Sequence, residues 1–188
     1  MVEGIYMQQS NSISKKEILL KLQRFFEGDE IESIYDLNIS PYISTALIYN
    51  TNDLCLNKEQ FDSLLSVIGP LETIYVVQND SDTIYEFDLP MVYEEYQSLN
   101  LFSLTVLTSS SFDWAVIIDE ELESGIGFFV ASNELVENFN FRYKGGLNDM
   151  LDLISFSFRD LSRNPRSIQN LFKIFSLLHV ARDQRNMN

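Results

Sequence analysis

The chain has 188 residues, and its 28 acidic and 13 basic side chains give a formal net charge of −15. Clustered Lys and Arg bind phosphate backbones and anionic membranes, so this balance argues against nucleic acid and membrane partners. The length predicts one domain over 1–188, and hydrophobic residues make up 45% of the chain, enough for a core. The start of the chain lacks a signal-peptide pattern and Cys55 is the only cysteine, which favours a cytoplasmic protein without disulfides.

The first third of the chain predicts two helices with a strand between them. Ser14 and Glu17 have the spacing of a capping box, which predicts a helix over about 14–27. Residues 42–50 are rich in β-branched and aromatic types, which predicts a strand. Asn57 can cap a second helix, which the pair Gly69-Pro70 would stop.

The middle of the chain predicts mainly strands with short connections. A turn of four polar residues, Asn79 to Asp82, separates two apolar runs and predicts a β-hairpin over 73–77 and 83–87. A short helix is expected over 91–99. Three further strands are expected over about 101–108, 113–119 and 126–131. Because the connections are short, we expect sequential strands to pair antiparallel.

The end of the chain predicts helices. Gly145-Gly146 breaks the chain, and apolar residues then recur at helical spacing from Leu147 onwards. Asn164-Pro165 suits the start of a last helix, so a helical region is expected over about 147–182. The fold class predicted is α+β: an antiparallel sheet of about five to seven strands, with helices at the N-terminus, in mid-chain and at the C-terminus packed on it.

The charge is distributed very unevenly along the chain. Residues 25–141, the acidic sheet region, hold 22 acidic residues and one basic residue, Lys58, whereas the flanks carry a net charge of +6. One explanation is that basic helices pack beside an acidic sheet and that the surplus charge keeps the protein soluble. The other is that a cationic partner relieves the repulsion among the carboxylates and is attracted to them.

Acidic residues gather in the predicted turns, where recognition residues tend to lie. Tyrosines lie among some of them and suit a contact surface, although half-buried sheet and helix positions explain them equally well. The predicted partner-binding residues are Asp80, Asp82, Glu86, Tyr93, Glu94, Glu95, Asp119, Glu120, Glu121 and Glu123.

The other candidates for chemistry favour structural roles. His179 is the only histidine, and no nucleophile or orienting carboxylate is indicated beside it. Cys55 suits a small core residue, and one His with one Cys does not make a zinc site. Trp114 suits a core anchor, with a place in a partner pocket as the alternative. The sequence therefore predicts no catalytic residue, no metal and no cofactor, and the chain is not expected to be an enzyme.

One stretch resembles a known class of proteins. Thr108–Val116, which contains Trp114, is followed by an acidic turn and by Gly125-Ile126-Gly127-Phe128. This segment resembles the strand–turn–strand segment of immunity proteins from bacterial contact-dependent growth inhibition and related polymorphic toxin systems. The resemblance implies a protein that binds a cognate toxin, commonly a basic nuclease, and blocks its active site or an adjacent surface. It assigns no role to any single residue.

Three functions are therefore carried forward as hypotheses. The first is an immunity or inhibitor protein that neutralises a cationic toxin through an acidic, tyrosine-bearing surface. The second is a DNA-mimicking anti-defence or regulatory protein that occupies a nucleic-acid-binding groove. The third is a hydrolase whose carboxylate site the sequence does not reveal.

Overall fold

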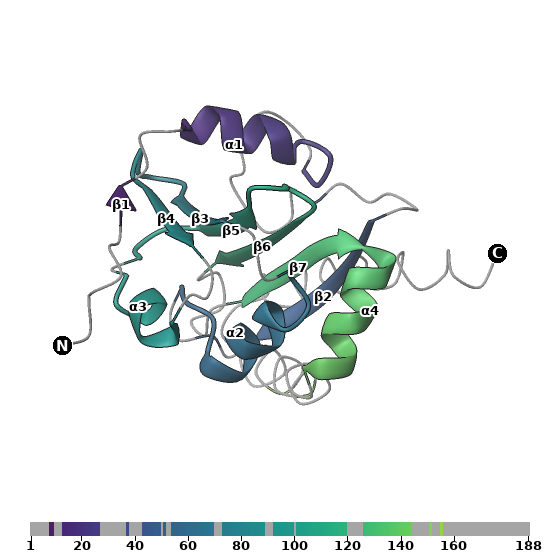
Figure 1. The fold of residues 1–188 in the computed structure, drawn as a ribbon. Helices are drawn as coiled ribbons and strands as arrows, with labels where there is room; N and C mark the ends of the chain where they lie inside the picture. Colours follow the sequence, from purple (N-terminus) through teal and green to yellow (C-terminus); the bar gives the residue numbers. More distant parts are fainter. Residues whose placement is uncertain are drawn as a thin grey trace.

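The fold was obtained as a computed structural model. It describes residues 8–9, 13–26, 37, 43–49, 51, 54–69, 73–88, 92–99, 101–119, 126–143, 151 and 155. In this part of the chain, seven strands form one antiparallel sheet in the order β1-β4-β3-β5-β6-β7-β2 (Figure 1). The strands are β1 (Gln8–Gln9), β2 (Ile43–Tyr49), β3 (Thr73–Gln78), β4 (Ile84–Asp88), β5 (Thr105–Ser109), β6 (Trp114–Asp119) and β7 (Ile126–Ser132).

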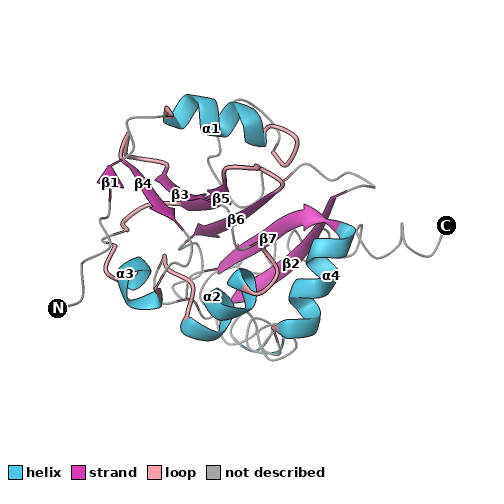
Figure 2. Cartoon of the chain, in the orientation of Figure 1, coloured by secondary structure: helices cyan, strands magenta, loops and turns pink. Residues whose placement is uncertain are grey.

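Helices cover both faces of this sheet. One face carries α1 (Lys15–Leu22), and the opposite face carries α2 (Lys58–Leu65), α3 (Tyr93–Gln97) and α4 (Asn133–Arg142), as Figure 2 shows. Period-two alternation sends successive strand residues to opposite faces, so each strand supplies both layers. An α+β architecture with an antiparallel sheet is confirmed.

The two faces of the sheet build two apolar clusters. Under α1, the helix residues Ile18 and Leu22 join a cluster of strand residues that includes Val77, Val106, Ile117 and Phe128. On the opposite face, the residues brought together include Phe61, Tyr96, Trp114, Phe129 and Phe139. Trp114 and Cys55 are both buried there, which confirms their interpretation as core residues.

The predicted helix starts are confirmed by the caps themselves. The Ser14 backbone N–H donates to Glu17 Oε2 at 2.8 Å, and the Glu17 backbone N–H donates back to Ser14 Oγ at 3.2 Å. Ser14 Oγ also donates to Glu17 Oε2, at 2.7 Å. The bonds that the Glu17 carboxyl accepts from the Ser14 backbone N–H and from Ser14 Oγ lower its pKa, because they favour its ionised form. At α2, Asn57 and Gln60 form the same reciprocal arrangement.

The first helix is shorter than its predicted range of 14–27. It ends at Leu22, and the chain continues in tight turns in which the Phe25 N–H donates to the Leu22 carbonyl at 2.8 Å. This tighter winding buries Phe25 and Phe26 together, and Phe26 bridges to Leu37. Phe25 and Phe26 continue the apolar spacing of the helix because both are buried, although the helix itself has ended at Leu22.

Two features of the fold were not predicted. Helix α4 follows β7 directly and begins at its cap, Ser132, whose side chain accepts from the Leu135 N–H.

Strand β1 pairs with β4 at one edge of the sheet, and β2 pairs with β7 at the other edge. The expected helical region over 147–182 lies outside the described residues, apart from Leu151 and Ser155, which are helical.

A buried polar contact links α3 to the segment before α2. The Tyr96 hydroxyl accepts from the Leu56 N–H at 2.9 Å, and its ring stacks on Phe61 with centroids 5.1 Å apart. Complete burial raises the pKa of Tyr96 well above its usual value, so the hydroxyl remains neutral.

Replacing Tyr96 by phenylalanine leaves the Leu56 N–H buried without its acceptor. We expect Tyr96→Phe to lower the free energy of unfolding by about 1–3 kcal/mol, measured by urea denaturation. Tyr85→Phe, at a half-buried position of β4, is the matched control and should change it by less than about 0.5 kcal/mol. Equal effects of the two changes would contradict a specific role for the hydrogen bond.

Candidate interaction surface

The turn between β3 and β4 presents two of the predicted partner-binding residues. Asp80 and Asp82 are both exposed in it. The turn is fixed from outside by Lys15 of α1, whose ammonium group donates to the Asn79 carbonyl and, at 3.2 Å, to the Ser81 carbonyl. The Thr83 N–H also donates to Ser81 Oγ at 3.0 Å. The two carboxylates therefore project from a well-held turn.

Asp119 lies at the same end of the sheet. The strand register places Gln78, Thr105 and Ile118 in one row across β3, β5 and β6, so the residues that follow Gln78 and Ile118 leave the sheet at one end. Strands β3 and β6 are two inter-strand spacings apart, about 10 Å. We call the group Asp80, Asp82 and Asp119 the acidic sheet end. The predicted residues Glu120, Glu121 and Glu123 follow Asp119 in sequence and lie outside the described residues.

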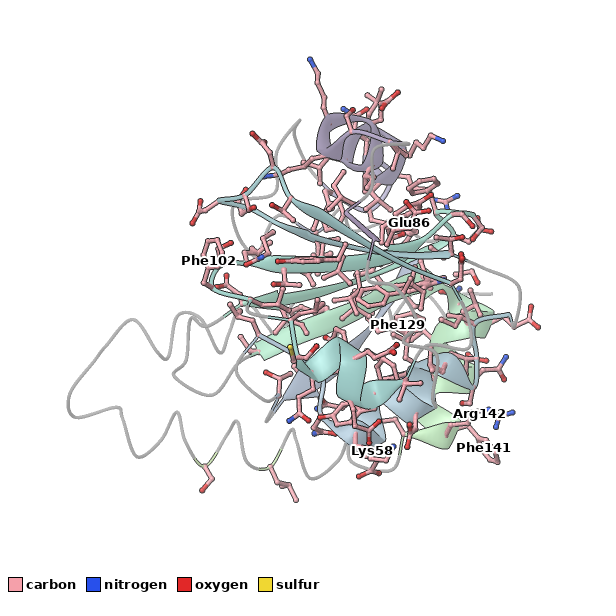
Figure 3. The ribbon with its side chains drawn as sticks, turned by 60° about the vertical axis from the view of Figure 1, so that its left-hand side comes forward. Lys58, Glu86, Phe102, Phe129, Phe141 and Arg142 are labelled. Carbon is pink, nitrogen blue, oxygen red and sulfur yellow. The ribbon has the colours of Figure 1, made fainter. Side chains whose placement is uncertain are left out.

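The other predicted residues do not join this group. Glu86 is half-buried in the middle of β4, and Figure 3 shows it well apart from Phe102, which marks the acidic sheet end. Its carboxylate lies near Tyr75, whose pKa is raised by burial and, secondarily, by Glu86 and Asp88. Glu94 and Glu95 lie on α3, on the face of the sheet opposite α1.

Tyr93 is not part of an exposed surface. Its side chain is 8% exposed, and its ring packs on Phe61 with centroids 5.4 Å apart. Lys58 Nζ lies 5.3 Å from the centroid of the same ring. The spacing that placed Tyr93 and Tyr96 among acids follows from a short helix, which buries one side of its surface and exposes the acids on the other. The expectation of a contact role for Tyr93 is therefore wrong.

Phe102 lies beside the acidic sheet end but was not singled out in the sequence. The strand predicted over 101–108 begins only at Thr105, and Phe102 lies in the preceding loop with 61% of its surface exposed. The loop leads into β5, which lies between β3 and β6, and Figure 3 shows Phe102 at one end of the sheet. A large exposed aromatic beside carboxylates is typical of a protein-binding surface.

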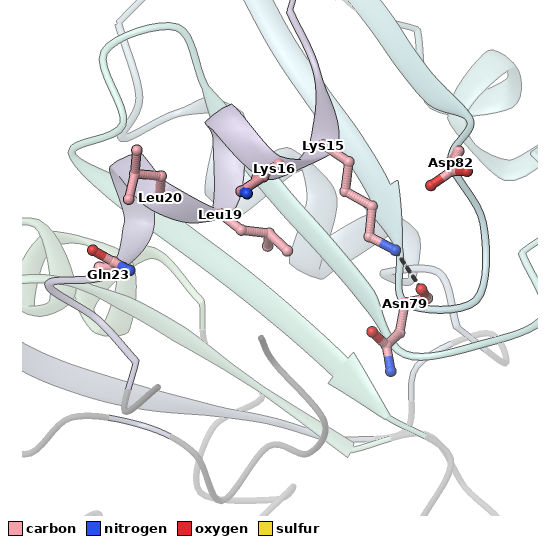
Figure 4. A pocket seen from close by; sticks show the side chains of 7 residues that line it. All are labelled: Lys15, Lys16, Leu19, Leu20, Gln23, Asn79 and Asp82. Atoms are coloured by element: carbon pink, nitrogen blue, oxygen red, sulfur yellow. Dashed lines mark hydrogen bonds between the residues drawn. The ribbon is translucent and has the colours of Figure 1, made fainter. Parts of the chain in front are cut away.

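Basic side chains of α1 lie next to one side of this surface. A hollow of about 670 Å³ separates α1 from the β3–β4 turn, and Lys16, Leu20 and Asp82 are among its lining residues (Figure 4). Lys15 spans this gap through its hydrogen bond to Asn79. Lys15 and Lys16 thus border the same hollow as Asp82, while the ammonium group of Lys15 is bonded to backbone carbonyls of the turn.

A second exposed aromatic lies on a distant part of the molecule. Phe141 of α4 is 85% exposed, and with Arg142 and Lys58 it borders a separate hollow of about 660 Å³. Figure 3 shows these three residues far from Phe102. This region carries basic groups, so it differs in charge from the acidic sheet end.

The described residues give no sign of a metal site or of a membrane-spanning helix, and comparisons of the chain with known proteins gave no match. Within the described residues, His, Cys, Asp and Glu side chains form no group of three or more that could hold a metal ion. No helix in the part of the chain that the structure describes is long and apolar enough to cross a membrane. Comparison of the chain with protein-family models, curated proteins and solved structures found nothing similar. Only the residues of this chain therefore support the candidate surface.

Proposed function

We propose that the chain is an immunity or inhibitor protein that binds a basic toxin, of the nuclease class, and neutralises it. The observation that carries the proposal is the charge asymmetry: 22 acidic residues against Lys58 alone over 25–141. The described part of this region exposes carboxylates at one sheet end, beside an exposed aromatic ring. Such a surface suits a cationic protein and repels nucleic acid and anionic membranes.

Neutralisation would be steric and electrostatic. Carboxylates of the acidic sheet end would pair with Lys and Arg side chains that otherwise bind the phosphates of the toxin's substrate. The bulk of the sheet and its helices would then cover the active site or an adjacent surface. The net charge of −15 acts over longer distances and accelerates the encounter of the two proteins.

Co-expression with a defined toxin tests this proposal. The probe is the C-terminal domain of the protein that the adjacent gene encodes, which under this proposal is the toxin, and we expect co-expression with this chain to restore growth. With purified proteins, the association rate constant should fall by about tenfold or more between low and high salt, because exposed charges are screened. Surface plasmon resonance at a series of salt concentrations measures this rate.

Two double variants that remove the same charge show which carboxylates accelerate association. Asp80→Asn with Asp82→Asn should slow association, whereas Glu59→Gln with Glu134→Gln removes the same charge from exposed positions on α2 and α4 and should have less effect. Continued growth arrest, together with no complex at low salt, would reject the proposed function. Equal effects of the two pairs would reject the acidic sheet end as its location.

A further inference from the structure

The loop before β5 exposes an aromatic ring where burial would be expected. Phe102 is 61% exposed, although its neighbours Leu101 and Leu104 pack against the core clusters. Single exposed rings are common on protein surfaces, and what distinguishes Phe102 from Phe141 is its place beside the exposed carboxylates of the β3–β4 turn, where a cationic partner could bury the ring.

Several hydrogen bonds fix the backbone of this loop. Gln78 Oε1 accepts from the Phe102 N–H at 2.8 Å, and Ser103 Oγ accepts from the Asp80 N–H at 3.3 Å. The Leu104 carbonyl accepts from the Asn79 N–H at 2.8 Å. The ring and the β3–β4 turn are therefore held as one unit, and little conformational entropy would be lost on binding.

The side chain beneath Phe102 has an unsatisfied donor. Gln78 is 1% exposed, and its Nε2 has no hydrogen-bond partner among the described residues. Because Oε1 of the same amide bonds to the Phe102 N–H, this nitrogen is held beside the backbone of the loop. Unsatisfied buried donors are rare and costly. The bond from Gln78 Oε1 holds the loop even though the Nε2 donor of the same amide stays buried and unpaired among the described residues.

We infer that Phe102 is the anchor residue of the acidic sheet end, and that its ring enters an apolar pocket on a basic protein. The pocket would be bordered by Lys or Arg side chains that pair with the exposed carboxylates of Asp80 and Asp82. This inference rests on the proposed function, since the partner is the same cationic toxin, and it adds the feature that holds the complex together.

The ring and the carboxylates contribute differently to binding. Exposed carboxylates mainly raise the association rate and give it a salt dependence, because their attraction acts at a distance and is screened. A buried aromatic anchor acts only after contact, so its loss raises the dissociation rate. The two contributions can therefore be separated by kinetics.

The test measures binding of the purified toxin domain encoded beside this chain, by surface plasmon resonance at about 0.1 M salt. Phe102→Ala should weaken affinity by about 10- to 30-fold, mainly through faster dissociation, and should leave the salt dependence of association unchanged. Phe102→Leu keeps apolar bulk and should lose less. Phe141→Ala, at a more exposed phenylalanine far from the acidic sheet end, is the control and should bind as the unaltered chain does.

The possible results distinguish a failure of the Phe102 anchor from a failure of the proposed function. If the unaltered chain binds and Phe102→Ala binds equally well, Phe102 is no anchor, while the proposed function stands. If Phe141→Ala loses as much affinity as Phe102→Ala, the inference is likewise overturned. If the unaltered chain shows no binding at low salt, the proposed function fails and the anchor fails with it. Circular dichroism and melting temperatures of each variant show that the fold is retained.

Discussion

Gly127→Ala is expected to lower the free energy of unfolding by about 3 kcal/mol or more. Gly127 lies in β7 and pairs with Ile118 of β6 and Ile48 of β2, so strands flank it on both sides. An added Cβ would overlap the Ile117 carbonyl oxygen and would lie 3.1 Å from the carbonyl carbon. These are backbone atoms of the sheet, which cannot rotate away as a flexible side chain can, so β6 and β7 would have to separate.

Gly69→Ala is the matched control for this change. Apart from its chain neighbours, no atom of the described residues lies within 4 Å of a Cβ placed on Gly69. The change should therefore alter the free energy of unfolding by less than about 0.5 kcal/mol. Urea denaturation of both variants measures the difference, and similar midpoints for the two would contradict the close approach of β6 and β7 at Gly127.

Phe129→Ala is expected to cost about 3–5 kcal/mol, because it removes a ring from the centre of the larger apolar cluster. Phe129 is fully buried in β7, and its ring lies 4.9 Å from that of Phe139 and 6.3 Å from that of Trp114, measured between centroids. Phe129 therefore contributes to the packing of α4 on the sheet. The cavity left behind cannot close easily, since a strand on one side and a helix on the other surround it.

Phe141→Ala tests whether the loss at Phe129 comes from burial. Phe141 also lies in the β7–α4 region but points into solvent (Figure 3). We expect its replacement to change the unfolding free energy by less than about 0.5 kcal/mol, measured by thermal and urea unfolding. A cost at Phe141 comparable to that at Phe129 would show that the ring of Phe141 packs against something in solution.

Local signals in the sequence were reliable where the interaction itself is local. The capping pairs Ser14 with Glu17 and Asn57 with Gln60 are three residues apart, so their bonds follow from the sequence alone. The hairpin over β3 and β4 was equally predictable, because its polar turn separates two apolar runs. Helix α4 was not predicted, although its signal is also local. Its cap Ser132 and the spacing of the buried residues that follow carry the signal.

The composition of the interaction surface could not be predicted, because it depends on which strands become neighbours. Asp80 and Asp119 share a sheet end only because β5 lies between β3 and β6. Glu86, by contrast, lies within the strand that the sequence predicted over 83–87, so its place in the middle of β4 was predictable. Phe102 was assigned to a strand because nothing local shows that Gln78, distant in sequence, binds its N–H and holds it out of the sheet ladder.

The pairing of β2 with β7 has a consequence for how the chain folds. Thr45 pairs with Val130, and all of β3, β4, β5 and β6 lie between them in the chain. The hairpins of the middle strands close short loops. Strand β2, by contrast, cannot pair until β7, the last of the described strands in chain order, has been synthesised. Long-range pairing of this kind slows folding. We therefore expect β2 to join last, and an unfinished chain on the ribosome to hold an apolar strand with no partner.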